Sequence, residues 1–290
     1  MLIRKNTLVA VTTKITKNIH NIKWPTSKVL AISTTRLNPF ALNQILSLAE
    51  RNNTEETVHS EETKLSSDFD YFNLGDHVGD CAEAVASNRD ALLNFFPKNT
   101  DIQWLKQVHG SYVAEIEQHN ILPIVADAAI TRQKRLALAI MTADCLPILL
   151  ADKNGTEIAA IHAGWRPLAD NIIEKTINKM HTPAKNICAW LGPCIGWQAF
   201  EVGEEVKHSF TGNSKTFAKA FIPTENDKAN SKSPTKYLAD IMMIASMQLE
   251  QLGIEKIANV KDCTYSDAKK YYSFRRDGRT GRMASVICIT

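Results

Sequence analysis

Three short apolar segments in the middle of the chain constrain its fold more than any other feature. They span residues 136–142, 146–150 and 158–162, and turn-forming or polar residues bound each of them. Apolar runs this short, with such boundaries, indicate buried strands. We therefore predict a group of buried strands at the centre of the protein.

Further strands and four helices are predicted around this centre. The predicted strands lie at 29–34, 102–107, 128–131, 187–191, 257–261 and 283–289. Apolar positions at helical spacing predict helices at 82–96, 167–180, 202–210 and 237–252. The strands and helices are not in strict alternation, so the order indicates an α+β fold with mixed sheets.

The chain has 290 residues, a length that fits one large domain. We predict a basic N-terminal extension at 1–28, followed by a catalytic domain at 29–290 with a polar insertion at about 41–69. Residues 1–49 contain basic but no acidic side chains, as a transit peptide or a poorly ordered arm would. We favour an N-terminal strand with basic edges, because no apolar core of a secretory signal follows.

The composition limits the cellular location and the classes of binding partner that we expect. The cysteines are scattered and form no CxxC pair: Cys81, Cys145, Cys188, Cys194, Cys263 and Cys288. This distribution fits reduced thiols in a cytoplasmic protein better than a disulfide framework. The net charge of +3 is too small to indicate nucleic-acid binding, and no apolar run is long enough to cross a membrane. We expect a cytoplasmic monomer with neither kind of partner.

Three residues at predicted strand ends carry metal-binding chemistry. His109, Cys145 and His162 each stand where a strand meets a turn. Two imidazoles and a thiolate suit Zn²⁺ and also accept copper, and three protein ligands leave a fourth position open, as in catalytic zinc sites. The alternative is that the histidines are hydrogen-bonded turn residues and the cysteine is a small buried hydrophobe. Spacing alone leaves both interpretations open.

These residues lie within segments that resemble the laccase-domain family, also called the YfiH type. The segments are FNLGDHVGD, QVHG, ADAAIT, TADCLPILLAD, IAAIHAGWR, LGPCIG, FEVGEEV, CTYSD and YYSFRRDGRTGR, in that order from residue 72 to residue 282. The resemblance implies a single-domain αββα-type sandwich with mixed β-sheets. It also implies that His109, Cys145 and His162 are metal ligands.

The resemblance further implies an enzyme that cleaves purine nucleosides with phosphate. Adenosine, inosine and methylthioadenosine would give free base and a ribose 1-phosphate, and adenosine deamination would be a further activity. Two segments depart from the family pattern, and one is the N-terminal extension before Trp24, which lacks a clear counterpart. The Thr34-Thr35-Arg36 sequence is followed by Leu37-Asn38-Pro39-Phe40 in place of a glycine-rich turn, which bears on substrate preference.

Roles around the metal follow from residue type and position. The predicted catalytic residues are Cys145, His162, His109 and Asp144. Asp144 would orient a ligand histidine or act as a general acid or base, although strand alternation would place it on the side opposite Cys145. The predicted substrate-binding residues are Arg166, Asn73, Gln107, Arg36 and Arg275. Arg166 is the first candidate for phosphate, because it stands at a predicted helix start.

Other functions remain open at this point. A copper-loaded polyphenol oxidase would use the same ligands, but multicopper oxidases use His-x-His pairs and none of the 8 histidines forms one. A metal-free cysteine hydrolase would use Cys145 as nucleophile and a histidine as base. A factor that edits peptidoglycan precursors is the remaining alternative.

Overall fold

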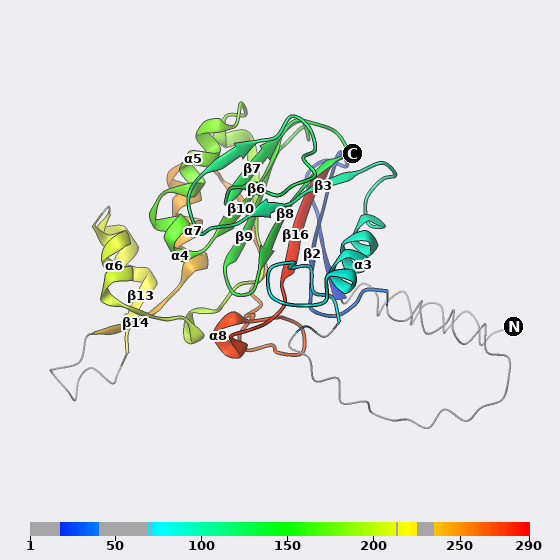
Figure 1. Cartoon of the computed structure of the whole chain (residues 1–290). Helices are drawn as coiled ribbons and strands as arrows, with labels where there is room; N and C mark the ends of the chain where they lie inside the picture. The colour runs from blue at the N-terminus through cyan, green and yellow to red at the C-terminus, as the bar shows by residue number, and fades with distance from the viewer. Residues whose placement is uncertain (1–17, 41–68, 70, 213, 225–234) are drawn as a thin grey trace, which may run out of the picture.

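Two mixed β-sheets stack face to face in the computed structural model, which describes residues 18–40, 69, 71–212, 214–224 and 235–290 (Figure 1). The five-stranded sheet has the order β1 (Ile19–Ile22), β2 (Val29–Thr34), β16 (Met283–Ile289), β8 (Leu136–Thr142), β3 (Asp101–Gln103). The six-stranded sheet has the order β15 (Lys256–Asn259), β11 (Ile187–Leu191), β9 (Leu146–Asp152), β10 (Ile158–Ala163), β7 (Ala128–Thr131), β5 (Val113–Glu115). Parallel pairs occur at β3–β8, β11–β15 and β5–β7, and the other pairs are antiparallel.

Alternating side chains of the central strands fill separate core layers. In β9, Leu149 and Ala151 pack into the layer between the two sheets, whereas Ile148 and Leu150 pack on the opposite face. Successive side chains of a strand point to opposite faces, so a strand that is apolar throughout must be covered on both sides. This explains why the central apolar segments form strands.

Helices cover the two outer faces of the sandwich. The outer face of the six-stranded sheet carries α4 (Trp165–Ala169), α5 (Ile172–Lys179) and α7 (Ile241–Gln251). The outer face of the five-stranded sheet packs against α3 (Ala82–Leu93) through Leu92. The order of layers is therefore helix, sheet, sheet, helix, and the expected αββα sandwich is confirmed.

Smaller elements surround these layers. A three-stranded sheet has the order β12 (Glu201–Gly203), β14 (Lys236–Ala239), β13 (Phe221–Pro223), and β4 (Leu105–Lys106) pairs with β6 (Ile124–Val125). Short helices are α6 (Glu204–Thr211), α8 (Phe274–Asp277), η2 (Ala184–Asn186), η3 (Trp197–Ala199) and η4 (Lys215–Ala220).

Two of the predicted helices differ from the observed ones for local reasons. The segment predicted as one helix at 167–180 is two helices, because Asn171 adopts a left-handed conformation with φ +56° between α4 and α5. The segment predicted at 237–252 begins as strand β14. Its helix starts only after Asp240, whose carboxylate accepts a hydrogen bond from the Met243 backbone N–H at 2.8 Å. The prediction for 237–239 was therefore wrong.

Other boundaries shift by a few residues. The helix predicted at 202–210 is preceded by β12 and runs over Glu204–Thr211. The strand predicted at 102–107 is divided into β3 and β4, which belong to different sheets.

The N-terminal segment contributes one strand to the sandwich. Within the predicted extension 1–28, β1 pairs antiparallel with β2. Residues 1–17, and residues 41–68 of the predicted insertion, lie outside the described residues. None of the described helices has the length and apolar character that a membrane crossing requires.

Candidate metal centre and active site

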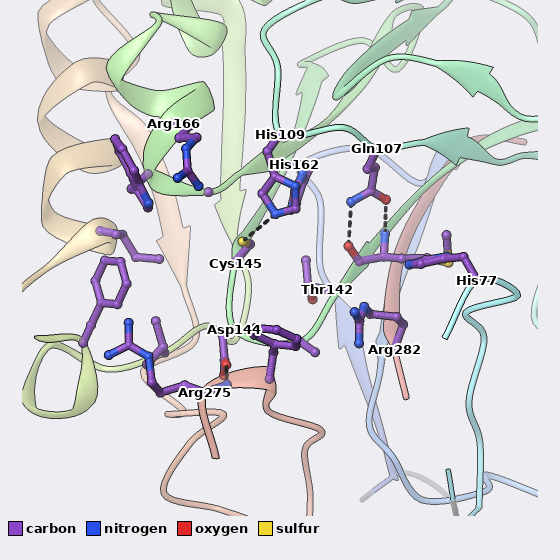
Figure 2. A pocket seen from close by; sticks show the side chains of 18 residues that line it. His77, Gln107, His109, Thr142, Asp144, Cys145, His162, Arg166, Arg275 and Arg282 are labelled. Atoms are coloured by element: carbon purple, nitrogen blue, oxygen red, sulfur yellow. Dashed lines mark hydrogen bonds between the residues drawn. The ribbon is translucent and has the colours of Figure 1, made fainter. Parts of the chain in front are cut away.

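The three predicted ligands come together at the wall of a cavity of about 360 Å³ (Figure 2). The ligand atoms of His109, Cys145 and His162 all lie within 4.8 Å of one another. The Cys145 Sγ lies 3.9 Å from Nε2 of His109, and the two imidazole rings meet edge to face with centroids 4.8 Å apart. Among the described residues this is the group of His, Cys, Asp and Glu side chains that could hold a metal ion.

Strand pairing brings Cys145 and His162 together. The register of β9 with β10 places His162 opposite Pro147, two residues after Cys145. Residues two apart in an extended segment face the same side, so the thiol lies diagonally across from the imidazole. Gly164 leaves room for the thiol, because a Cβ at that position would lie 3.0 Å from the Cys145 Sγ.

A buried carboxylate, Asp127, connects the two histidines. Its Oδ1 lies 2.8 Å from Nδ1 of His162 and accepts the His109 backbone N–H at 3.0 Å. Its Oδ2 accepts the backbone N–H groups of Val108 at 3.1 Å and Gly110 at 2.8 Å. Because an ionised carboxylate only accepts hydrogen bonds, Nδ1 of His162 carries its proton toward Asp127, which leaves Nε2 available to bind a metal ion.

The loop that carries His109 depends on this carboxylate. His109 has φ +58°, in the left-handed region that residues other than glycine rarely occupy. Three successive backbone N–H groups of the loop point at Asp127 and hold that conformation. One buried side chain thus fixes the ring of His162 and the backbone of His109. Sequence reasoning did not single out Asp127, although it lies in the ADAAIT segment.

The ligands also perturb one another electrostatically. Burial alone would raise the pKa of the Cys145 thiol, but the charges and hydrogen bonds of His162 and His109 lower it to about 6. Burial alone would lower the pKa of His162, but Cys145 and Asp127 raise it to about 9. The chain without metal therefore favours a thiolate beside an imidazolium. Metal binding would displace the Nε2 proton of that imidazolium.

The donor set fits zinc. One thiolate and two neutral imidazole nitrogens are typical zinc ligands, and the carboxylate behind His162 is the partner that zinc-bound histidines commonly have. His109 and Cys145 are less buried than His162 and face the cavity. A fourth ligand can therefore come from the cavity, as the sequence interpretation requires.

The hydrogen-bond partners of Asp144 differ from those that we predicted. Its φ of +109° turns the carboxylate toward the C-terminal loop, where it accepts hydrogen bonds from Thr264 Oγ1 at 2.7 Å, Ser273 Oγ at 3.0 Å and the Arg275 backbone N–H at 2.7 Å. The carboxylate that contacts a candidate ligand histidine is Asp127 and not Asp144. Asp144 lines the cavity and holds the start of α8 against it.

Three of the predicted substrate-binding residues line the cavity. Arg166 and Arg275 lie to the left of Cys145 in Figure 2, and Gln107 lies to the right. The Gln107 amide pairs with the backbone of Met141, since it donates to the Met141 carbonyl and accepts from the Met141 N–H, both at 2.8 Å. Its contacts are those of a structural residue of the wall.

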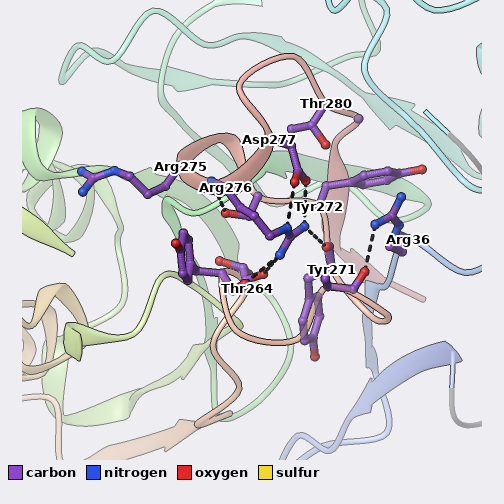
Figure 3. Close-up of polar contacts among 12 residues, drawn as sticks. Arg36, Thr264, Tyr271, Tyr272, Arg275, Arg276, Asp277 and Thr280 are labelled. Atoms are coloured by element: carbon purple, nitrogen blue, oxygen red, sulfur yellow. Dashed lines mark hydrogen bonds and ion pairs between the residues drawn. The ribbon is translucent and has the colours of Figure 1, made fainter. Parts of the chain in front are cut away.

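The other two predicted residues lie outside the cavity lining. Asn73 is buried and hydrogen-bonded within its own turn. The guanidinium of Arg36 donates to the Ala268 carbonyl at 2.8 Å, and its central carbon lies 4.9 Å from the ring centroid of Tyr272. Figure 3 shows Arg36 beside this C-terminal loop, with Arg275 directed away from it. Arg36 therefore joins β2 to the loop.

Two titratable lining residues were not singled out from the sequence. His77 and Arg282 face the cavity from the FNLGDHVGD and YYSFRRDGRTGR segments. The cavity is also lined by apolar side chains, those of Trp165, Ile195, Phe200, Ile241 and Phe274. The family-like segments were the signal that could have identified both residues.

Comparisons with known sequences show which family the chain belongs to. The family model described as multi-copper polyphenol oxidoreductase laccase matches residues 58–290. A purine nucleoside phosphorylase of Pseudomonas aeruginosa is 41% identical over 219 residues, which cover 76% of this chain and 86% of that relative. The purine nucleoside phosphorylase YfiH of Escherichia coli K12 is 40% identical over 219 residues, with the same shares of 76% and 86%.

Solved structures give the same assignment. The Neisseria meningitidis protein NMB0706 superposes with a TM-score of 0.75 and 33% identity, over 94% of this chain and 99% of that one. YlmD of Geobacillus stearothermophilus gives a TM-score of 0.69 and 25% identity, over 91% and 93% of the two chains. The chain therefore belongs to the laccase-domain family that includes the YfiH proteins, as its sequence segments predicted.

Proposed function

We propose that this protein is a zinc-dependent purine nucleoside phosphorylase that acts on adenosine, inosine or methylthioadenosine, with adenosine deamination as a further activity. The observation that carries the proposal is the cluster of His109, Cys145 and His162 at the wall of a cavity large enough for a small molecule. Relatives named as purine nucleoside phosphorylases, about 40% identical to this chain, support the choice of substrate.

The reaction would exchange one bond for another. A phosphate oxygen forms a bond to the anomeric carbon of the ribose, and the bond from that carbon to the base nitrogen breaks. The base leaves with the electron pair of that bond and takes up a proton. Zinc held by the three ligands would supply a Lewis acid that stabilises negative charge developing on a substrate oxygen.

The residues of the chain would position the reactants. Asp127 keeps the Nδ1 proton on His162 and fixes the loop of His109, so the ligands are set before substrate arrives. Trp165, Phe200 and Phe274 give the cavity an aromatic wall that suits the flat faces of a purine.

A cysteine hydrolase is a second candidate, because Asp127, His162 and Cys145 stand in the order of an orienting carboxylate, a base and a nucleophile. A copper-loaded polyphenol oxidase is a third, because two histidines and a cysteine are also copper ligands. The described residues hold one such cluster, whereas multicopper oxidation uses several ions.

Metal content and phosphate dependence together distinguish these functions. We would measure bound metals by mass spectrometry on the wild type and on Cys145→Ala, and base release from inosine and adenosine with and without phosphate. Near-stoichiometric zinc that is lost in Cys145→Ala, with phosphate-dependent base release, supports the phosphorylase. Cys188→Ala is the matched control, because that thiol is buried in β11 outside the cluster.

The opposite results identify the alternatives. Absence of metal, together with a product whose formation needs no phosphate, would support the hydrolase instead. Bound copper, together with oxidation of a polyphenol, would support the oxidase instead.

The six cysteines have free thiols, which is consistent with the expected cytoplasmic location. Cell fractionation and sedimentation would test that location and the expected monomeric state.

A further inference from the structure

Arg282 is a cation at the cavity wall that forms no ion pair with a described carboxylate, although the charges of Cys145 and Asp144 attract it from within the cavity. It lies between α8 and β16, is partly buried, and faces the cavity. Its Nη1 donates to the carbonyls of Thr280 at 2.9 Å and Gly281 at 3.0 Å. Within the part of the chain that the structure describes, no carboxylate forms an ion pair with Arg282, and Nε and Nη2 have no hydrogen-bond acceptor. A partly desolvated cation of this kind is stabilised by an incoming anion.

Two neutral or weakly basic groups share this side of the cavity. Thr142 is 4% exposed, lines the cavity, and its hydroxyl makes no hydrogen bond to a described residue. His77 lines the cavity and is exposed, with Nδ1 3.4 Å from its neighbour Asp76. Figure 2 shows Thr142, His77 and Arg282 on the side of Cys145 opposite Arg166 and Arg275. A guanidinium, a hydroxyl and an imidazole are all donors to phosphate oxygens.

Arg282 is held in position by a segment that is distant in the sequence. The buried Asn73 accepts the Arg282 backbone N–H at 2.8 Å and the Gly75 N–H at 2.9 Å. The stem of Arg282 then packs onto Gly75, where a Cβ would lie 2.8 Å from its Cγ. Asn73, predicted as a substrate-binding residue, therefore supports this wall from behind.

The opposite side of the cavity is suited to a flat apolar group. Arg166 is exposed and its guanidinium carbon lies 4.4 Å from the ring centroid of Trp165. Arg275 lies 5.4 Å from the ring centroid of Phe200 and donates to the Glu201 carbonyl. Exposed guanidinium groups stacked on aromatic rings are screened by water, so they bind a phosphate more weakly than a desolvated arginine does.

We propose that inorganic phosphate binds on the wall formed by Arg282, Thr142 and His77, and that the purine occupies the aromatic wall beside Arg166. This assignment rests on the proposed phosphorylase function. It moves the phosphate from Arg166, the sequence-based candidate, to the other side of the metal ligands. Phosphate and base would then lie on opposite sides of the three candidate zinc ligands, and the sugar would lie between them.

The test uses the zinc-loaded enzyme and compares Arg282→Gln with Arg166→Gln. The KM for phosphate at saturating inosine and the KM for inosine at saturating phosphate are measured for each. We expect Arg282→Gln to raise the phosphate KM by about 10- to 100-fold, the effect of losing a hydrogen-bonded charge, and to leave the inosine KM unchanged. Arg166→Gln should raise the inosine KM instead. A raised phosphate KM in Arg166→Gln but not in Arg282→Gln would overturn the assignment.

Two further measurements separate misfolding and failure of the proposed function from failure of the inference. Arg282→Lys keeps the charge and should recover part of the phosphate affinity, while stoichiometric zinc shows that each variant is folded. Calorimetric titration with inorganic phosphate alone needs no turnover. If the wild type cleaves nucleosides without phosphate, the proposed phosphorylase function is wrong. Phosphate binding that Arg282→Gln abolishes would still support the wall as an oxyanion site, and an absence of binding in the wild type would refute it.

Discussion

Oδ1 of Asp127 lies 2.8 Å from Nδ1 of His162. The two residues are opposite each other where β10 ends and β7 begins, since the His162 backbone N–H donates to the Asp127 carbonyl at 2.7 Å. The side chains of such a cross-strand pair stand on the same face. The same carboxylate also accepts the backbone of the His109 loop. The three candidate metal ligands are therefore positioned by a carboxylate that lies outside their cluster.

Replacement of Asp127 by Asn should weaken zinc binding by about 10- to 100-fold, as for other groups that orient a metal-bound histidine. The amide oxygen of the asparagine still accepts hydrogen bonds. Its NH2 group, however, points a donor either at His162 or at the backbone N–H groups of the His109 loop. Competition with a chromophoric chelator measures the affinity. Asp152→Asn is the control, because Asp152 is a buried carboxylate that accepts backbone N–H groups in the β9–β10 turn. Equal zinc affinity in Asp127→Asn and the wild type would contradict this role.

A methyl group at position 164 should disturb the thiolate. In Gly164→Ala the new Cβ would lie 3.0 Å from the Cys145 Sγ, closer than ordinary van der Waals contact. We expect lower zinc content at equal expression, measured by mass spectrometry. Gly110→Ala provides the comparison, because its Cβ would meet Asp127 at 3.6 Å, an ordinary contact. If both variants lose zinc to the same extent, crowding of the thiol is not the cause.

Metal-free protein should show an unusually reactive Cys145. The thiolate is the nucleophilic form, and the pKa of this thiol is lowered to about 6. Alkylation by iodoacetamide should therefore already be fast at neutral pH and slow down as the pH falls through about 6. His162→Ala removes the stabilising imidazole and should move the midpoint toward the ordinary thiol value of about 8.5.

Zinc should protect the same thiol from alkylation. Peptide mapping of the zinc-loaded and zinc-stripped protein measures the modification of Cys145, and the exposed Cys81 serves as an internal reference. Rapid modification of Cys145 in both forms would show that the thiol is not a zinc ligand.

Removal of the Asp144 carboxylate should lower the stability of the fold more than it lowers metal binding. Asp144→Ala leaves the donors of Thr264, Ser273 and Arg275 without their acceptor. We expect the free energy of unfolding to fall by about 1–3 kcal/mol while zinc stays bound. Chemical denaturation and metal analysis of the same samples test this. Loss of turnover at unchanged stability in Asp144→Asn would instead indicate the general acid or base role.

The fold could be predicted where the signal is local. The strands of the sandwich follow from short apolar runs, and their burial on both faces explains why β8, β9 and β10 contain almost no polar residue. The strand at 236–239 was missed because its few residues continue the apolar pattern of α7, and the N-cap at Asp240 separates them.

The sequence by itself determined the central strands, the family, and the three residues that gather around one point, because hydrophobic patterning and short motifs are properties of neighbouring residues. Only the tertiary structure decided which carboxylate contacts His162, and that Arg282 faces the cavity together with Arg166 and Arg275. Asp127 is 35 residues from His162, and Asn73 is 209 residues from the Arg282 backbone that it holds. Such pairs form when strands and loops from distant parts of the chain pack together, and no local pattern encodes the side chain that will lie opposite.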